Sequence, residues 1–119
     1  MVLVDTSVWV NHLRHGNGVL ATLLDETQVL VHPFVIGELA CGHLSNRTRI
    51  LALLHRLPPA PRATDSEVLA FIERRSLMGV GVGYVDTHLL AAAALGRVPI
   101  LTSDRRLARV ASGLGLAYA

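Results

Sequence analysis

The chain has 119 residues, of which 51% are hydrophobic and 17% are charged, and its formal net charge is +2. This length supports one hydrophobic core, so we expect a single domain over residues 1–119. The high apolar content excludes a disordered chain, and the lone cysteine, Cys41, excludes a disulfide scaffold. We expect Cys41 to be a buried free thiol in a reducing cytoplasm. No apolar run reaches the roughly 18 residues of a membrane helix, and the N-terminus lacks the basic start of a signal peptide.

All 11 basic residues are arginine. Every chemistry that requires a lysine is therefore excluded. This removes nucleotide binding by a P-loop, Schiff-base catalysis, and phosphatase sites that use a lysine to hold a phosphoryl group.

The first part of the chain predicts two strands separated by two helices. The apolar run Val2–Val4 is typical of a buried strand. Helical patterns follow over residues 6–13 and 19–24, and the glycines between them separate the two helices. A second short strand is expected over residues 28–31.

The middle part predicts two helices and an extended segment. Pro33 begins a helix that reaches about residue 44, since proline lacks only an N–H that the first turn leaves unpaired. Asn46 is expected to cap a helix over residues 47–56. The prolines between residues 57 and 61 forbid a helix interior there.

The last part predicts further helices and a buried strand. Thr64 and Glu67 form a capping box for a helix that reaches about residue 77. The elements after it are an alanine-rich helix over residues 85–95 that Gly96 ends, a strand over 98–102, a helix over 104–110 and a terminal strand over 114–118. Apolar strands that alternate with helices predict an α/β domain with a mostly parallel central sheet.

Four of the acidic residues stand beside apolar segments. Asp5 ends the first strand, Asp104 follows the strand over residues 98–102, and Glu38 and Asp86 lie in helices. Because parallel strands end at the same edge of a sheet, Asp5 and Asp104 should be neighbours. Capping of a helix start is the alternative for all of them except Glu38. For Glu38 the alternative is a partner arginine.

A cluster of carboxylates suits Mg²⁺ or Mn²⁺, which prefer oxygen ligands. Nearby hydroxyl groups are expected to orient these carboxylates, and the candidates are Thr6, Ser7, Thr102 and Ser103. Zinc is a poor match, because Cys41 has no partner thiolate and no pair of histidines has metal-binding spacing.

Four segments, in this order and spacing, carry a resemblance to a known family: VLVDTSVWV, HPFVIGELACG, YVDTHLLAAA and ILTSDRRL. Together they resemble the PIN-domain endoribonucleases, and most closely the VapC-type toxins of bacterial toxin–antitoxin pairs. The resemblance covers nearly the whole chain.

The resemblance implies a three-layer α/β/α sandwich with a mostly parallel central sheet. It also implies that four acids bind Mg²⁺ or Mn²⁺ and catalyse RNA cleavage, namely Asp5, Glu38, Asp86 and Asp104. It further implies a cytoplasmic homodimer without a membrane partner, which cuts RNA and binds a VapB-like antitoxin through a hydrophobic groove.

An acidic site repels RNA, so basic side chains are needed beside it to bind the strand. The candidates that follow Asp104 are Arg105, Arg106 and Arg109, whose phosphate contacts would be largely independent of sequence. Arg74 and Arg75 are further candidates, with an ordinary helix end as the alternative.

Several other residues are expected to have ordinary structural roles. Trp9 and Tyr84 are able to stack on bases, but we expect both in the core. His88 is expected on a helix surface, and Asp65 is expected to be an ordinary acid in the first turn of a helix.

Two other functions stay open. The first is a PIN-fold module for RNA binding or protein interaction that does not use its acidic site. The second is a phosphohydrolase with Asp5 as nucleophile, which the missing second aspartate and the missing lysine argue against.

Overall fold

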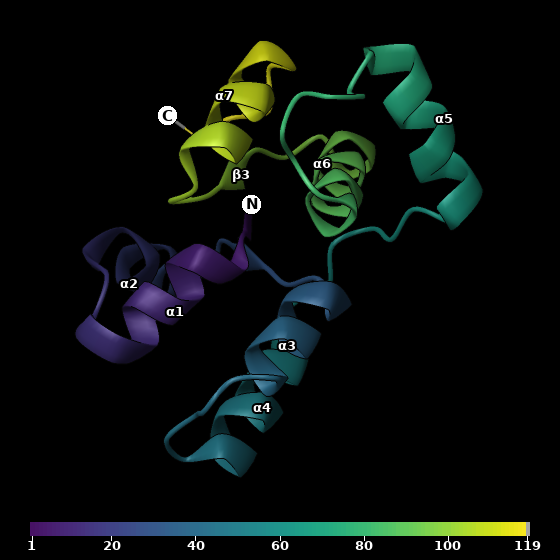
Figure 1. The fold of residues 1–119 in the computed structure, drawn as a ribbon. Helices are drawn as coiled ribbons and strands as arrows, with labels where there is room; N and C mark the ends of the chain where they lie inside the picture. The colour runs from purple at the N-terminus through teal and green to yellow at the C-terminus, as the bar shows by residue number, and fades with distance from the viewer. Residues whose placement is uncertain (119) are drawn as a thin grey trace.

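The computed structural model describes residues 1–118 and places short strands among helices (Figure 1). The strands are β1 (Val2–Val4), β2 (Val29–Leu30) and β3 (Ile100–Leu101). The helices are α1 (Thr6–His15), α2 (Gly18–Asp25), α3 (Pro33–Ala40), α4 (Arg47–Arg56), α5 (Asp65–Arg75), α6 (Tyr84–Gly96) and α7 (Arg105–Gly113).

The sheet has the strand order β2-β1-β3, and β1 pairs in parallel with both neighbours. Single parallel bridges continue it at the two edges, from Val31 to Pro59 and from Ile100 to Ala117. A parallel sheet flanked by helices confirms the predicted α/β fold. It also explains the continuous apolar runs of the strands, because both faces of such a sheet are covered.

The chain leaves β1 toward one edge of the sheet and later returns to the other edge. In Figure 1, α1–α4 occupy the lower part of the molecule and α5–α7 the upper part. Functional sites in such folds lie at the carboxyl ends of the strands where the winding direction changes. Here those are the ends of β1 and β3.

The main core gathers buried side chains from the three strands and from α1–α4, α6 and α7. Leu3 and Val4 of β1 are fully buried, as are Leu89 and Leu90 of α6. Burial of each such side chain stabilises the folded chain by about 1.5–3 kcal/mol relative to leaving it exposed. Residues 87–93 of α6 are all buried, and the alanines among them let neighbouring elements approach closely. Within residues 1–118, no helix combines the length and the apolar character that crossing a membrane requires.

β1 has its predicted bounds, but the later strands are shorter than predicted, because neighbouring helix ends use some of the expected strand donors. The Val98 N–H donates to Ala93 in the last part of α6, so β3 begins later than residue 98. The Leu116 N–H likewise donates to the carbonyl of Ala111 near the end of α7. The predicted terminal strand over residues 114–118 is therefore reduced to the bridge at Ala117.

The predictions for the end of α3 and the start of α4 were wrong in three respects. The α3 helix ends at Ala40 rather than near residue 44, and the Arg47 guanidinium binds the freed carbonyls of Ala40 and Gly42. Cys41 is consequently exposed at the helix end rather than buried. Asn46 precedes α4 with a φ of 54°, and its side chain makes no capping hydrogen bond.

Gly96 is the last residue of α6 rather than the residue that follows its end. A Cβ at this position would stand 3.1 Å from the Pro61 ring, so close packing against Pro61 explains the glycine. The residue that ends the helix is Arg97, in the left-handed region with a φ of 53°.

Candidate metal and catalytic site

Asp5 stands at the carboxyl end of β1 and is only 6% exposed. Its Oδ2 accepts hydrogen bonds from the hydroxyls of Ser7 at 2.8 Å and Thr102 at 2.7 Å. Its side chain makes no capping bond to α1. The capping alternative is therefore wrong for Asp5, and the two hydroxyls hold its carboxylate at the edge of the sheet.

A network of hydroxyls joins the ends of β1 and β3. The backbone N–H of Ser103 donates to Ser7 Oγ at 3.0 Å, and that of Asp104 donates to Thr102 Oγ1 at 3.0 Å. Ser103 thus takes part through its backbone rather than through its hydroxyl. The network fixes the segment that carries Asp104 relative to Asp5.

Glu38 is exposed on α3, where Thr6 Oγ1 donates to its Oε1 at 2.6 Å. This contact joins the start of α1 to α3. No arginine within residues 1–118 forms an ion pair with Glu38. Solvent and the Thr6 hydroxyl therefore satisfy the carboxylate, and the alternative of a partner arginine was wrong.

Asp86 and Asp104 each accept a hydrogen bond from a backbone N–H at the start of their own helix. Asp104 caps α7 by accepting from the Leu107 N–H at 3.0 Å, and Asp86 Oδ2 accepts from the Gly83 N–H at 3.3 Å. The capping alternative is confirmed for Asp104. Capping leaves the second oxygen of each carboxylate available to a cation.

Partial burial raises the pKa of the Asp86 carboxyl above its usual value. The negative charges of Asp5, Asp104 and Glu38 raise this pKa further, whereas the hydrogen bond from Gly83 opposes the shift. Asp86 thus lies within electrostatic reach of the other three predicted acids. A cation among them would offset this repulsion.

The side chains of residues 1–118 do not bring three acids together around one point at metal-binding distances. The donor set nevertheless fits Mg²⁺, which commonly takes one or two carboxylates and keeps several waters. Asp5 meets this requirement best, because two hydroxyls hold one of its oxygens in place. The remaining acids fit as ligands that act through water.

The side chains around Asp65 contradict three of the predictions. Asp65 Oδ1 accepts from Tyr84 Oη at 3.3 Å and lies 3.3 Å from His88 Nε2. Asp65 is therefore more than a first-turn acid, although Thr64 and Glu67 form the predicted capping box. His88 is 1% exposed rather than on the surface, and Tyr84 is 47% exposed rather than in the core.

The three arginines that follow Asp104 are exposed on α7, namely Arg105, Arg106 and Arg109. The side chain of Arg106 lies across Gly81, where a Cβ would stand 2.9 Å from the guanidinium. This contact joins α7 to the glycine-rich loop before α6, and the sequence pattern did not predict it. Trp9 is buried, as expected.

Comparison with known proteins identifies the family. The PIN domain family model matches residues 2–113. The chain is 43% identical to Ribonuclease VapC32 of two Mycobacterium tuberculosis strains, over 100% of this chain and 97% of the relative. The crystal structure of FitAcB from Neisseria gonorrhoeae shares the fold, with a TM-score of 0.65 and 18% identity over 94% of each chain. The chain therefore belongs to the PIN domain family and, within it, to the VapC-type ribonucleases.

Proposed function

We propose that this chain is a Mg²⁺- or Mn²⁺-dependent endoribonuclease and the toxin of a type II toxin–antitoxin pair. Family membership supports the reaction type. The observation that carries the assignment of the site is the buried Asp5 carboxylate at the end of β1, which two hydroxyls hold in place. The charges of Asp5, Asp104 and Glu38 also raise the pKa of Asp86. The proposal places the enzyme in the cytoplasm, where RNA is its substrate.

The proposed mechanism assigns distinct tasks to the acids. Asp5, Glu38 and Asp86 would hold the cation, directly or through water, and Asp104 would act from the outer side of the site. A bound divalent cation supplies Lewis acidity that activates a water molecule and offsets charge on the transferring phosphoryl group. Thr102 orients Asp5, and Arg105 and its neighbours on α7 bind flanking phosphates.

Cleavage of RNA is expected to require added Mg²⁺ or Mn²⁺ and to stop in excess EDTA, because oxygen ligands need a hard cation. The measurement is gel analysis of a labelled RNA incubated with purified protein. Restoration of cleavage when Mg²⁺ exceeds the chelator is the control. Undiminished cleavage in EDTA by protein free of contaminating nuclease would contradict the metal-dependent mechanism.

An open apolar groove supports the antitoxin part of the proposal. The groove has a volume of about 330 Å³ and is lined by Trp9, Leu24, Ile50, Leu53, Leu54, Arg56 and Leu57. It runs between α1, α2 and α4 and suits the apolar face of a partner helix. We assign it to a VapB-like antitoxin.

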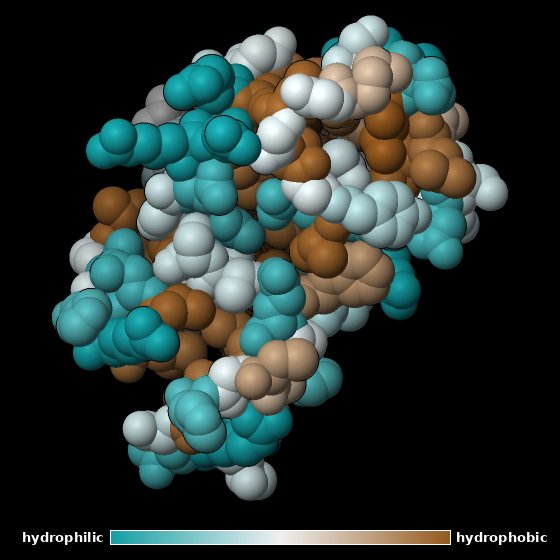
Figure 2. Space-filling model, in the orientation of Figure 1, coloured by the Kyte–Doolittle hydropathy of each residue, from teal (hydrophilic) through white to brown (hydrophobic). Residues whose placement is uncertain are grey.

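A homodimer would use a different surface. Figure 2 shows hydrophobic side chains over α5, and Leu69 of α5 and Met78, three residues beyond its end, are more than half exposed. Exposed apolar patches of this kind mark protein interfaces.

The Leu53→Glu variant is expected to keep its nuclease activity and to lose neutralisation by the antitoxin. A charge buried in an apolar interface is costly and should weaken antitoxin binding at least about tenfold. The measurement is growth arrest upon co-expression with the small protein encoded beside the toxin gene. Val19→Glu, which is similarly exposed but lies outside the groove, is the matched control. Full neutralisation of Leu53→Glu would remove the groove from the antitoxin interface.

A further inference from the structure

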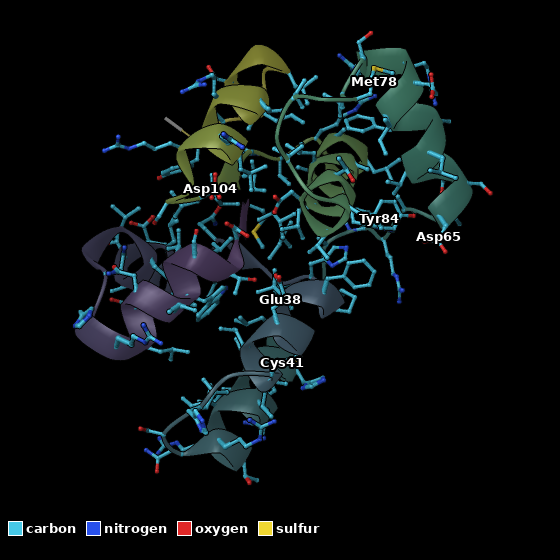
Figure 3. All side chains as sticks on the ribbon, viewed as in Figure 1. Glu38, Cys41, Asp65, Met78, Tyr84 and Asp104 are labelled. Atoms are coloured by element: carbon cyan, nitrogen blue, oxygen red, sulfur yellow. The ribbon has the colours of Figure 1, made fainter. Side chains whose placement is uncertain are left out.

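Beside the acidic site lies an exposed aromatic surface that the proposed mechanism does not use. We call Phe34, Arg62 and Tyr84 the aromatic shelf. Tyr84 begins α6, and its hydroxyl donates to Asp65 at the start of α5, as Figure 3 shows for the two labelled residues. Phe34 lies in the first turn of α3 and is partly exposed.

The buried His88 supports both rings of the shelf. Its ring centroid lies 4.7 Å from that of Tyr84, at an angle of 87°, and 4.7 Å from that of Phe34, at 60°. A perpendicular contact covers at most one face of the Tyr84 ring. Because Tyr84 is 47% exposed, an uncovered face is open to solvent. The hydrogen bond to Asp65 fixes the orientation of that face.

The shelf is continuous with the acidic site. Phe34 and Glu38 are four residues apart on α3, so both project from the same side of that helix. Tyr84 and Asp86 leave the first turn of α6 on different sides, so Phe34, through its contact with His88 beside Tyr84, connects the shelf to the acids. A strand whose phosphate lies among the acids would therefore have its neighbouring nucleotides within reach of the shelf.

Arg62 adds a cation to the shelf. Its guanidinium carbon lies 5.2 Å from the centroid of the Phe34 ring, and its side chain is exposed. Within residues 1–118 no carboxylate forms an ion pair with it. Asp65, the nearest acid along the chain, contacts Tyr84 and His88 instead. The positive charge of Arg62 is therefore available to a phosphate.

We propose that the aromatic shelf is the binding site for the nucleotide next to the cleaved bond of a single-stranded RNA. One base stacks on the open face of Tyr84, and Arg62 pairs with the adjoining phosphate. An open aromatic face together with an unpaired guanidinium is the combination that single-stranded nucleic acids use. The inference rests on the proposed ribonuclease function, because it names how that site holds its substrate.

The test measures RNA affinity in the Asp5→Asn background, which keeps the RNA intact. A fluorescent single-stranded 12-nucleotide RNA is titrated with each protein in Mg²⁺, and anisotropy gives the Kd. Tyr84→Leu is expected to weaken binding about tenfold. Tyr84→Phe, which keeps the ring, is expected to stay within about twofold. Tyr118→Leu removes another exposed tyrosine, beside α2, and should leave the Kd unchanged.

Arg62→Gln provides a second measurement, the salt dependence of the Kd, which does not depend on Tyr84. Loss of one phosphate contact should reduce the slope of log Kd against log salt by about 1. This variant changes only an exposed side chain, so it keeps the proposal falsifiable if Tyr84→Leu does not fold.

Three outcomes would overturn the inference. The first is an unchanged Kd for a Tyr84→Leu protein that keeps its melting temperature. The second is an unchanged salt slope for Arg62→Gln. The third is a Tyr84→Leu protein that light scattering shows to have lost a dimer while its RNA affinity per chain is unchanged. That result would make the shelf a protein interface. Absence of RNA cleavage by the unmodified chain would instead contradict the proposed function, so the two failures are distinguishable.

Discussion

The Asp5→Asn variant is expected to cut RNA at least about 100-fold more slowly than the unmodified chain. Side chains that only orient a metal ligand are already worth 10–100-fold, and Asp5 is the carboxylate best placed to be a ligand itself. Asparagine preserves the shape of the side chain and still accepts from Ser7 and Thr102. The measurement is the initial rate of cleavage of a labelled RNA at saturating Mg²⁺.

The same substitution should change how the fold responds to metal. A cation at a hundred times its Kd stabilises a binding protein by about 2.7 kcal/mol. This gain should shrink in Asp5→Asn and should be seen as a smaller rise of the melting temperature with Mg²⁺. Without metal the variant should lose little stability, because removing the charge of Asp5 relieves repulsion with Asp86.

Asp25→Asn is the matched control, since Asp25 is an exposed acid at the end of α2. Asp65 is unsuitable for this purpose, because it accepts from Tyr84 and approaches His88. If Asp5→Asn cuts RNA and binds metal as well as Asp25→Asn does, Asp5 has a purely structural role. The module that does not use its acidic site would then be the better description.

Acidification from pH 6.5 to about pH 4 is expected to destabilise the fold by about 3 kcal/mol through His32 alone. His32 is fully buried, and its Nδ1 accepts from the Phe34 N–H at 3.0 Å at the start of α3. The pKa of His32 is lowered from 6.5 to about 4, mainly by burial and also by the nearby charges of His88 and Arg62. A protonated ring loses the lone pair that caps the helix.

The sign of this effect follows from the two protonation states. Between pH 6.5 and about pH 4 the unfolded chain binds a proton on His32 and the folded chain does not. The free energy of unfolding therefore falls as the pH falls through this window, and the full stability is present above pH 6.5.

The measurement is urea unfolding of metal-free protein across this pH range, for the unmodified chain and for His32→Asn. Asparagine keeps an acceptor for the helix start and does not titrate. The difference in unfolding free energy between the two proteins should therefore shrink or reverse by about 3 kcal/mol on acidification. His15→Asn, at an exposed site, is the control. A difference that is independent of pH would show that His32 does not govern acid stability.

Local sequence signals predicted the fold class because the structures they specify are local. The run Val2–Val4 is apolar at consecutive positions, which only a strand covered on both faces tolerates. The capping box of Thr64 and Glu67 closes within one turn of helix, so the start of α5 was predictable to the residue. The parallel sheet and its helices followed from the alternation of such segments.

Element ends depended on partners that the local sequence does not reveal. β3 begins late because the Val98 N–H bonds to the end of α6. α3 ends early, and Arg47, seven residues after Ala40, binds its terminal carbonyl. Cys41 is exposed at that early end.

The sequence by itself determined that Asp5, Thr102 and Asp104 would lie at one edge of the sheet, because parallel strands all end at the same edge. Only the tertiary structure decided what each group contacts there. Asp5 binds the hydroxyl of Thr102, 97 residues away, and caps no helix, whereas Asp104 caps α7. Tyr84 and His88 share one side of α6, but Tyr84 is the first residue of the helix and stays exposed, whereas His88, one turn later, is buried against Tyr84 and against Phe34 of α3. Periodicity within a helix shows which residues share a side, but the elements packed around the helix determine which of those residues are covered.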